Sequence, residues 1–157
     1  MTEDQAKVAV LGCSGIGRLV STVVRQAVYL IAQDRPDEVV VVSSGSLTGN
    51  VLEALRAARK YPVVVIDGCR PKCADAIARG RNLNLVAHVW VPEVAAKYKL
   101  SIAGEKRTGL SDKGMALARK VADEVIDRVD ATLAAKGARP AAEGIDIAAA
   151  EQEMSTL

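Results

Sequence analysis

The residues of this sequence best suited to chemistry are its three cysteines, Cys13, Cys69 and Cys73. Only three residues separate Cys69 from Cys73, so a single turn can aim both sulfur atoms at one point. Thiolates are zinc ligands and also nucleophiles, and convergent cysteines therefore indicate a metal site or thiol chemistry. The first residues are acidic and polar, unlike a signal peptide, and three cysteines without a secretory signal argue against a disulfide framework.

The paired cysteines directly follow a predicted buried strand. Residues 63–66 are four consecutive β-branched apolar residues, a pattern typical of a parallel strand that is covered on both faces. The strand is expected to end at residues 67–68. Pro71 suits the first position of a helix, because its missing N–H would have no partner there. Cys69 is therefore expected in a loop and Cys73 in the first helical turn.

The predicted surroundings of these thiols favour their ionised form. The first turn of a helix presents free N–H groups and the positive end of the helix dipole, and both stabilise a thiolate. The positive charges of Arg70 and Lys72 act in the same direction.

Hydrophobic periodicity predicts strands and helices that alternate along the chain. Strands are expected over residues 7–11, 38–42, 63–66 and 84–91, the last of them stopped by Pro92. Helices are expected from the glycine-rich turn at 12–17 to before Pro36, from the cap Asn50 to Tyr61, from Pro71 to about Arg79, and from Ser111 to about Lys136. Other segments are expected as a polar loop (43–49), one or two helical turns (93–99) and a surface connection rather than a lid (100–110).

This alternation predicts an α/β fold, a three-layer open sheet that is mainly parallel and Rossmann-like or flavodoxin-like. We expect the strand order 2-1-3-4 and a long C-terminal helix. Residues 1–136 are predicted to form one domain, and residues 137–157 a tail that is weakly helical or disordered. The narrow apolar stripe of the long helix is expected to pack on the sheet, with a homodimer through this helix as the alternative.

Composition excludes several classes of partner. The net charge is only +2 and aromatic residues make up 3% of the chain, which argues against nucleic acids and anionic membranes as partners. No apolar run reaches the ~18 residues that a membrane-spanning helix needs. We therefore expect a cytoplasmic protein.

The predicted topology brings the cysteines together. Ligands of open parallel sheets bind at the carboxyl ends of the strands, where successive connections diverge to opposite faces. Cys13 follows the first strand and Cys69 follows the third, and the order 2-1-3-4 makes these strands neighbours. Cys13, Cys69 and Cys73 are therefore the predicted ligands of a metal ion, most simply zinc.

The fourth position of such a site is expected to be open, as in zinc sites that bind water or substrate. His88, the only histidine, is the alternative fourth ligand, although a histidine within a strand is more often a core residue with a satisfied hydrogen bond. Asp67 can supply a carboxylate to the metal or accept hydrogen bonds from loop amides, and we favour the second role.

The glycine-rich turn after the first strand is the other candidate binding element. The predicted cofactor-binding residues are Gly12, Ser14, Gly15, Gly17, Asp67 and Gly68. The turn differs from a dinucleotide-binding loop, because its glycines are spaced GxxGxG and no acidic residue ends the second strand. Four residues separate Cys13 from Arg18, whereas a cysteine phosphatase loop has five. A small anion at this helix start remains an alternative.

The combination of Cys13-Ser14-Gly15 after the first strand with Ile66-Asp67-Gly68-Cys69 and Cys73 resembles the DGC-domain family, which is named for its Asp-Gly-Cys motif. The resemblance covers roughly residues 7–90. It implies a cytoplasmic, mostly prokaryotic protein with a cysteine-based zinc site and no established reaction. The family is described by four cysteines, and the one expected near the end of the second strand corresponds to Ser43-Ser44 here.

Three functions follow as hypotheses. The first is a small zinc-binding protein that carries or senses the metal. The second is thiol redox or thiol-transfer chemistry, with Cys69 as the nucleophile and Cys73 or Cys13 as the resolving thiol, although the CX3C spacing differs from the CXXC of thioredoxin-like enzymes. The third is a protein that binds an anion or phosphate at the Cys13–Arg18 turn.

Overall fold

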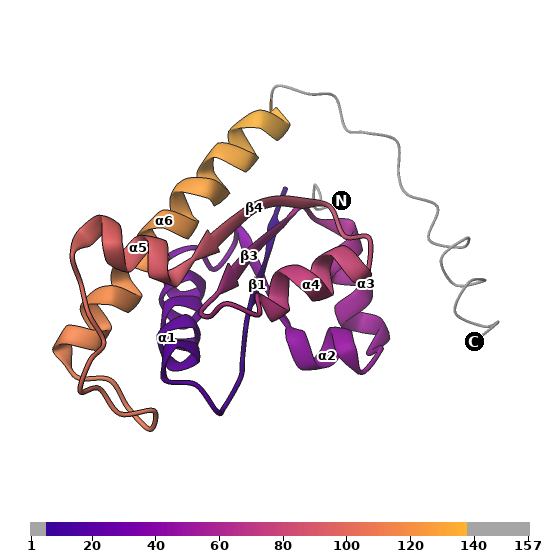
Figure 1. The fold of residues 1–157 in the computed structure, drawn as a ribbon. Coiled ribbons are helices and arrows are strands. Elements are labelled where there is room, and N and C mark those ends of the chain that lie inside the picture. The colour runs from indigo at the N-terminus through magenta and orange to yellow at the C-terminus, as the bar shows by residue number, and fades with distance from the viewer. Residues whose placement is uncertain (1–5, 138–157) are drawn as a thin grey trace.

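A four-stranded parallel sheet organises the computed structural model, which describes residues 6–137 (Figure 1). The elements in chain order are β1 (Val8–Gly12), α1 (Leu19–Asp34), β2 (Val39–Ser43), α2 (Ser44–Thr48), α3 (Leu52–Lys60), β3 (Val63–Asp67), α4 (Cys73–Gly80), β4 (Leu85–Trp90), α5 (Val91–Tyr98) and α6 (Asp112–Gly137). The strand order is β2-β1-β3-β4 with every pair parallel, so the predicted order is confirmed. This is the order of flavodoxin-like sheets. The predicted C-terminal tail lies outside the described residues, apart from Gly137 at the end of α6.

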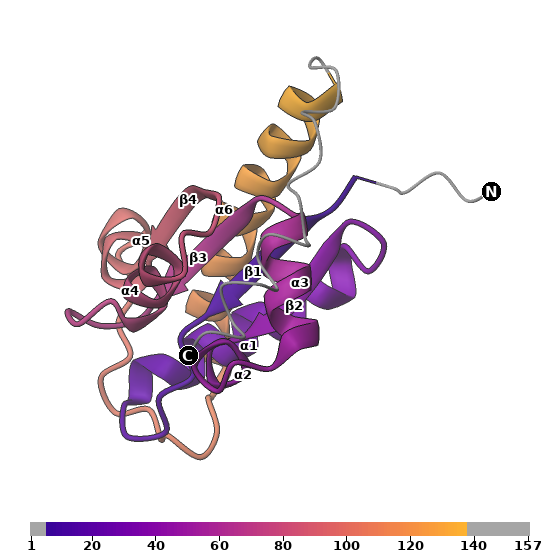
Figure 2. The same cartoon turned by 90° about the vertical axis from the view of Figure 1, so that its right-hand side faces the viewer.

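Helices cover both faces of the sheet and complete the three predicted layers. Helices α1 and α6 pack on one face, and α3 and α4 pack on the other (Figure 2). The two central strands carry the near-continuous apolar runs that burial on both faces requires, and all five residues of β3 are buried. None of the helices in residues 6–137 is both long and apolar enough to cross a membrane.

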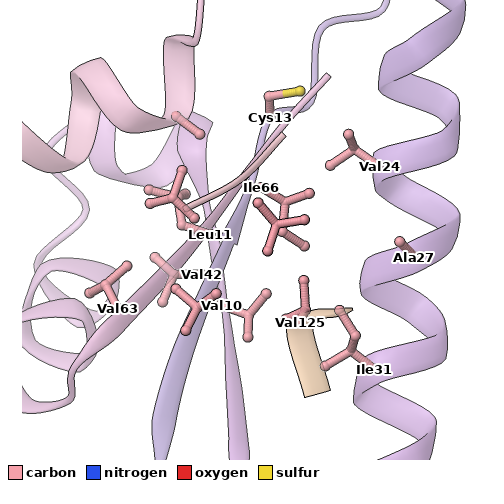
Figure 3. Packing of buried hydrophobic residues seen from close by; sticks show 14 of the residues in the cluster. Val10, Leu11, Cys13, Val24, Ala27, Ile31, Val42, Val63, Ile66 and Val125 are labelled. Atoms are coloured by element: carbon pink, nitrogen blue, oxygen red, sulfur yellow. The ribbon is translucent and has the colours of Figure 1, made fainter. Parts of the chain in front are cut away.

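One part of the core lies between the sheet and the pair α1 and α6, and another lies on the opposite face, where Leu55 of α3 and Ala74 of α4 are buried. Val24, Ala27 and Ile31 of α1 are fully buried at the predicted helical spacing and face the sheet (Figure 3). Val125 of α6 reaches the same region beside Ile31. The apolar stripe of α6 therefore packs within the chain, as expected, and a homodimer through this helix stays a prediction.

Two glycines let α1 approach the carboxyl ends of the central strands. A Cβ atom at Gly12 would lie 2.8 Å from a methyl carbon of Val28, and one at Gly68 would lie 2.9 Å from a methyl carbon of Val20. Both distances are shorter than real Cβ contacts allow. These glycines therefore allow α1 to pack closely, and their predicted role in binding a cofactor stays a prediction.

Two local predictions between β2 and α3 were wrong. The segment 43–49 is not a flexible loop, because residues 44–48 form α2, and the Ser43 hydroxyl accepts a hydrogen bond from the Ser46 amide at 3.5 Å. Asn50 does not cap the next helix. Its backbone is left-handed, with φ of 57°, a conformation that asparagine tolerates well, and Val51 is the residue that precedes α3.

The start of the helix after β3 was also predicted too early. Pro71 lies in the connecting turn, and α4 begins at Cys73, preceded by Lys72 with a left-handed φ of 48°. A left-handed residue reverses the path of the chain, so the helix cannot extend back to Pro71. Cys73 nevertheless lies in the first helical turn, as expected. Pro92 ends β4 less directly than predicted, since α5 already begins at Val91.

The burial of α1 gives a direct test of the fold. Ile31→Ala is expected to lower the free energy of unfolding by about 2–5 kcal/mol, because it removes a fully buried side chain and leaves a cavity. Tyr29→Ala, in the same helix but 59% exposed, is expected to change it by less than about 0.5 kcal/mol. Urea unfolding followed by circular dichroism measures both variants. Equal effects would contradict this packing of α1.

Candidate functional site

Cys13 lies against the turn that carries Cys69. Gly12 pairs with Ile66 in the sheet, and the Cys13 amide donates to the Ile66 carbonyl at 2.9 Å. The Gly68 amide in turn donates a hydrogen bond to Cys13 Sγ at 3.3 Å. The Cys13 sulfur therefore contacts the residue immediately before Cys69, although the two cysteines are distant in the chain.

Cys13 is a buried thiol with a polar lining. Its side chain is 7% exposed, and its sulfur lies 3.9 Å from the Ser21 hydroxyl oxygen in the first turn of α1. Burial raises the pKa of the Cys13 thiol, and the hydrogen bonds from Gly68 and Ser21 oppose this effect only in part. The neutral thiol is therefore the favoured form until a positive charge, such as a metal ion, approaches the sulfur.

The other two cysteines are more accessible. Cys69 is half-buried and Cys73 is exposed. The Lys72 amide donates to the Cys69 carbonyl at 3.1 Å, which closes a tight turn between the two cysteines. The Lys72 ammonium lies 4.6 Å from the centre of the Trp90 ring, so a positive charge is held beside this turn.

The carboxylate of Asp67 fastens the first turn of α4 to the sheet. Asp67 is 1% exposed, and its two oxygens accept hydrogen bonds from the amides of Ala74 at 2.9 Å and Asp75 at 3.0 Å. Helix α4 has no side-chain cap from Lys72, so Asp67 supplies this cap from the preceding strand. The role that we favoured for Asp67 is present, with helix amides in place of loop amides.

His88 is the second partner of Asp67. Its Nε2 atom lies 3.0 Å from Asp67 Oδ2, and its side chain is 23% exposed. A histidine with a satisfied hydrogen bond inside a strand is therefore what the structure shows. A role as fourth metal ligand would fall to the other ring nitrogen, Nδ1, with Nε2 still bonded to Asp67.

Polar contacts also join the ends of the strands near Cys13. The hydroxyl oxygens of Ser14 and Ser44 lie 2.7 Å apart and join the ends of β1 and β2. Helix α1 has no side-chain cap at its start, the place given above for a small anion as an alternative, and that alternative stays a prediction. Sequence analysis missed Ser21 as a neighbour of Cys13, although a polar residue within the apolar face of a predicted helix was an available signal.

These residues do not form a ready-made metal cage. Within residues 6–137, no three side chains of histidine, cysteine, aspartate or glutamate already form a group that could hold a metal ion. The donor chemistry nevertheless fits a thiophilic ion, since one thiol lies at the end of β1 and two lie on the turn after β3.

The family model for the DGC domain matches residues 9–125. The chain belongs to the DGC-domain family. This confirms the resemblance seen in the cysteine motifs, and the match extends well beyond them into α6. No curated protein and no solved structure matches the chain.

The role of Asp67 can be tested by a single isosteric change. Asp67→Asn is expected to lower the free energy of unfolding by about 1–3 kcal/mol, because an amide cannot accept the bonds from both helix amides and His88. Asp37→Asn makes the same chemical change at an exposed position and should shift stability by less than about 0.5 kcal/mol. Denaturant unfolding at neutral pH measures both. An Asp67→Asn protein as stable as Asp37→Asn would show that Asp67 does not anchor α4.

Proposed function

We propose that this protein binds a zinc ion through Cys13, Cys69 and Cys73 and carries or senses the metal. The observation that carries the proposal is the hydrogen bond from the Gly68 amide to Cys13 Sγ, which joins the sulfur at the end of β1 to the turn of Cys69. Three thiolates leave one coordination position for water or an acceptor, which suits a metal that is exchanged.

Metal binding would convert the Cys13 thiol into a thiolate. Burial favours the neutral thiol in the absence of metal, but zinc binds thiolates and supplies the charge that stabilises them. The Gly68 amide and the Ser21 hydroxyl already lie within hydrogen-bond distance of this sulfur. They would continue to support the thiolate once it forms.

The turn at residues 69–73 is the part that would move to complete the site. Cys73 is exposed, and Lys72 holds a left-handed conformation that costs roughly 1–2 kcal/mol in a residue with a side chain. Strain at Lys72 lowers the cost of rearranging this turn. Asp67 would keep α4 attached during the change, because its bonds go to Ala74 and Asp75 beyond the turn.

We also infer a cytoplasmic location from the state of the cysteines. The three cysteines are free in the structure, and a metal site made of thiols needs a reducing compartment to persist.

Metal content tests the proposal. Protein purified without chelators is expected to hold about one zinc per chain, as measured by elemental mass spectrometry. Zinc affinity should fall at least tenfold in each single variant, because each loses one thiolate: Cys13→Ser, Cys69→Ser and Cys73→Ser. His88→Gln is the matched comparison. Unchanged affinity in this variant indicates an open fourth position, whereas a similar loss makes His88 the fourth ligand. Full occupancy in the triple Cys→Ser variant would refute the proposal.

A second candidate function is thiol–disulfide exchange by Cys69 and Cys73. The observation that favours it is their accessibility, with the turn held by the Lys72 amide and the positive charge of Lys72 nearby. The Cys69 thiolate would attack a disulfide of the substrate and release one thiol. Cys73 would then attack the Cys69 sulfur, form a Cys69–Cys73 disulfide and release the second thiol.

Thiol alkylation distinguishes this chemistry from metal binding. In metal-free protein, an exchange enzyme should show Cys69 alkylation at pH 7 at least tenfold faster than a free cysteine, because only the thiolate reacts. Mass spectrometry of peptides after timed iodoacetamide treatment gives the rate at each cysteine, with buried Cys13 as the slow internal reference. Rates at Cys69 and Cys73 no greater than that of a free cysteine would exclude the redox function.

A further inference from the structure

The connection between α5 and α6 lies against the loop that follows Cys13. In both views this segment runs past the start of α1 and beside the loop after β1 (Figures 1 and 2). We define residues 101–111 as the strap. Its sequence predicted a surface connection, and nothing in the pattern indicated what the strap contacts.

The strap is fastened to the beginning of α6. The Lys113 ammonium of α6 donates to the Ala103 carbonyl of the strap at 3.0 Å, and within the strap the Glu105 carboxylate accepts hydrogen bonds from the amide and the hydroxyl of Ser111, the residue just before α6. Lys106 and Gly109 form an antiparallel bridge that closes the tip of the strap. The tip, which includes Arg107, is therefore held in a defined place relative to α6.

Arg107 joins the strap to two elements around Cys13. Its guanidinium Nη1 donates to the Gly17 carbonyl at 3.2 Å, and its own carbonyl accepts a hydrogen bond from the Thr22 hydroxyl at 2.8 Å. Thr22 is 4% exposed and also accepts a hydrogen bond from Arg25 at 3.0 Å. One residue thus connects the loop after β1 with the first turn of α1.

The first turn of α1 transmits this connection to Cys13. Ser21 and Thr22 are successive residues about 100° apart around the helix, so they face different neighbours. Ser21 faces the sulfur of Cys13, and Thr22 faces the strap. The Thr22 bond goes to the main-chain carbonyl of Arg107, so it anchors the strap beside Ser21 and is kept when only the Arg107 side chain is changed.

The loop itself has little packing of its own to hold it. Residues 14–17 are exposed, two of them are glycines, and the Ile16 side chain is 85% exposed. The loop is tied down by the hydrogen bond from Arg107 to Gly17 and by the contact between Ser14 and Ser44. Such a loop opens easily once one of its few contacts is removed.

From these contacts we propose that Arg107 is a positioning residue that holds the loop 14–17 closed over Cys13 and so controls access to this thiol. Cys13 is 7% exposed, and its sulfur contacts Ser21 in the first turn of α1, to which this loop leads. Under the proposal, opening of the loop is the step that exposes the sulfur to a metal ion or reagent. The proposal goes beyond zinc binding, because it concerns access to the thiol whether or not a metal binds.

The test uses full-length protein in which Cys69→Ser and Cys73→Ser leave Cys13 as the sole thiol. In this background Arg107→Ala is expected to raise the rate of Cys13 alkylation by neutral iodoacetamide about three- to tenfold, the size expected for the loss of one hydrogen bond of ordinary strength at an exposed position. Lys106→Ala is the matched control, since it removes a neighbouring positive charge but no contact with the loop. Its rate should equal that of the parent.

Hydrogen exchange separates loop opening from general destabilisation. Arg107→Ala should speed exchange at the Ser21 amide, which donates to the Arg18 carbonyl at 3.2 Å next to the loop, while β1 and the middle of α1 keep their protection. Equal alkylation rates in Arg107→Ala and Lys106→Ala would overturn the proposal, and so would faster exchange throughout β1. Because this background lacks two of the proposed metal ligands, failure of zinc binding would leave the result unaffected.

Discussion

The parallel pairing of β1 with β3 is the interaction on which the rest of this structure depends. Both strands are buried on their two faces, so their apolar runs require helices above and below the sheet. The pairing ends at Gly12 and Ile66, and at this edge Cys13 meets the turn after β3. The close approach of α1 to this edge needs glycine at residues 12 and 68, because a methyl group at either position would collide with a valine of α1.

The buried carboxylate of Asp67 at the same edge has three defined partners. Asp67 would be costly to bury alone, and it is stabilised by two amides of α4 and by His88. It thereby links β3, α4 and β4 through one side chain. The same contacts explain why a carboxylate next to the cysteines serves the structure first and is a poor candidate for a metal ligand.

Cys13 differs from the other two cysteines in a way that suits a regulated site. Its thiol is buried and its pKa is raised, whereas Cys69 and Cys73 lie on a turn that solvent reaches. Under the proposed zinc binding, the metal would meet the accessible thiols first and Cys13 afterwards. The strap at residues 101–111 contacts the loop after Cys13 through the bond from Arg107 to the Gly17 carbonyl, and this contact is the basis of the proposed control of access.

The sequence by itself determined the α/β class, the strand order and the membership of the DGC-domain family. Long valine and isoleucine runs are compatible with buried parallel strands, and the motifs around Cys13 and Cys69 are local, so both can be read without coordinates. Sequence also placed Cys73 in the first turn of its helix. It misplaced the start of that helix and the cap of α3, because left-handed residues at Lys72 and Asn50 depend on how the neighbouring elements dock.

Only the tertiary structure decided which partners the site residues have. The bonds of Asp67 to α4 and His88, the approach of Ser21 to Cys13 and the contact of Arg107 with Gly17 join residues that no local pattern relates. The physical reason is that strand and helix formation follow from the spacing of neighbouring residues, whereas hydrogen bonds between distant polar groups form only after the packed core has brought them together.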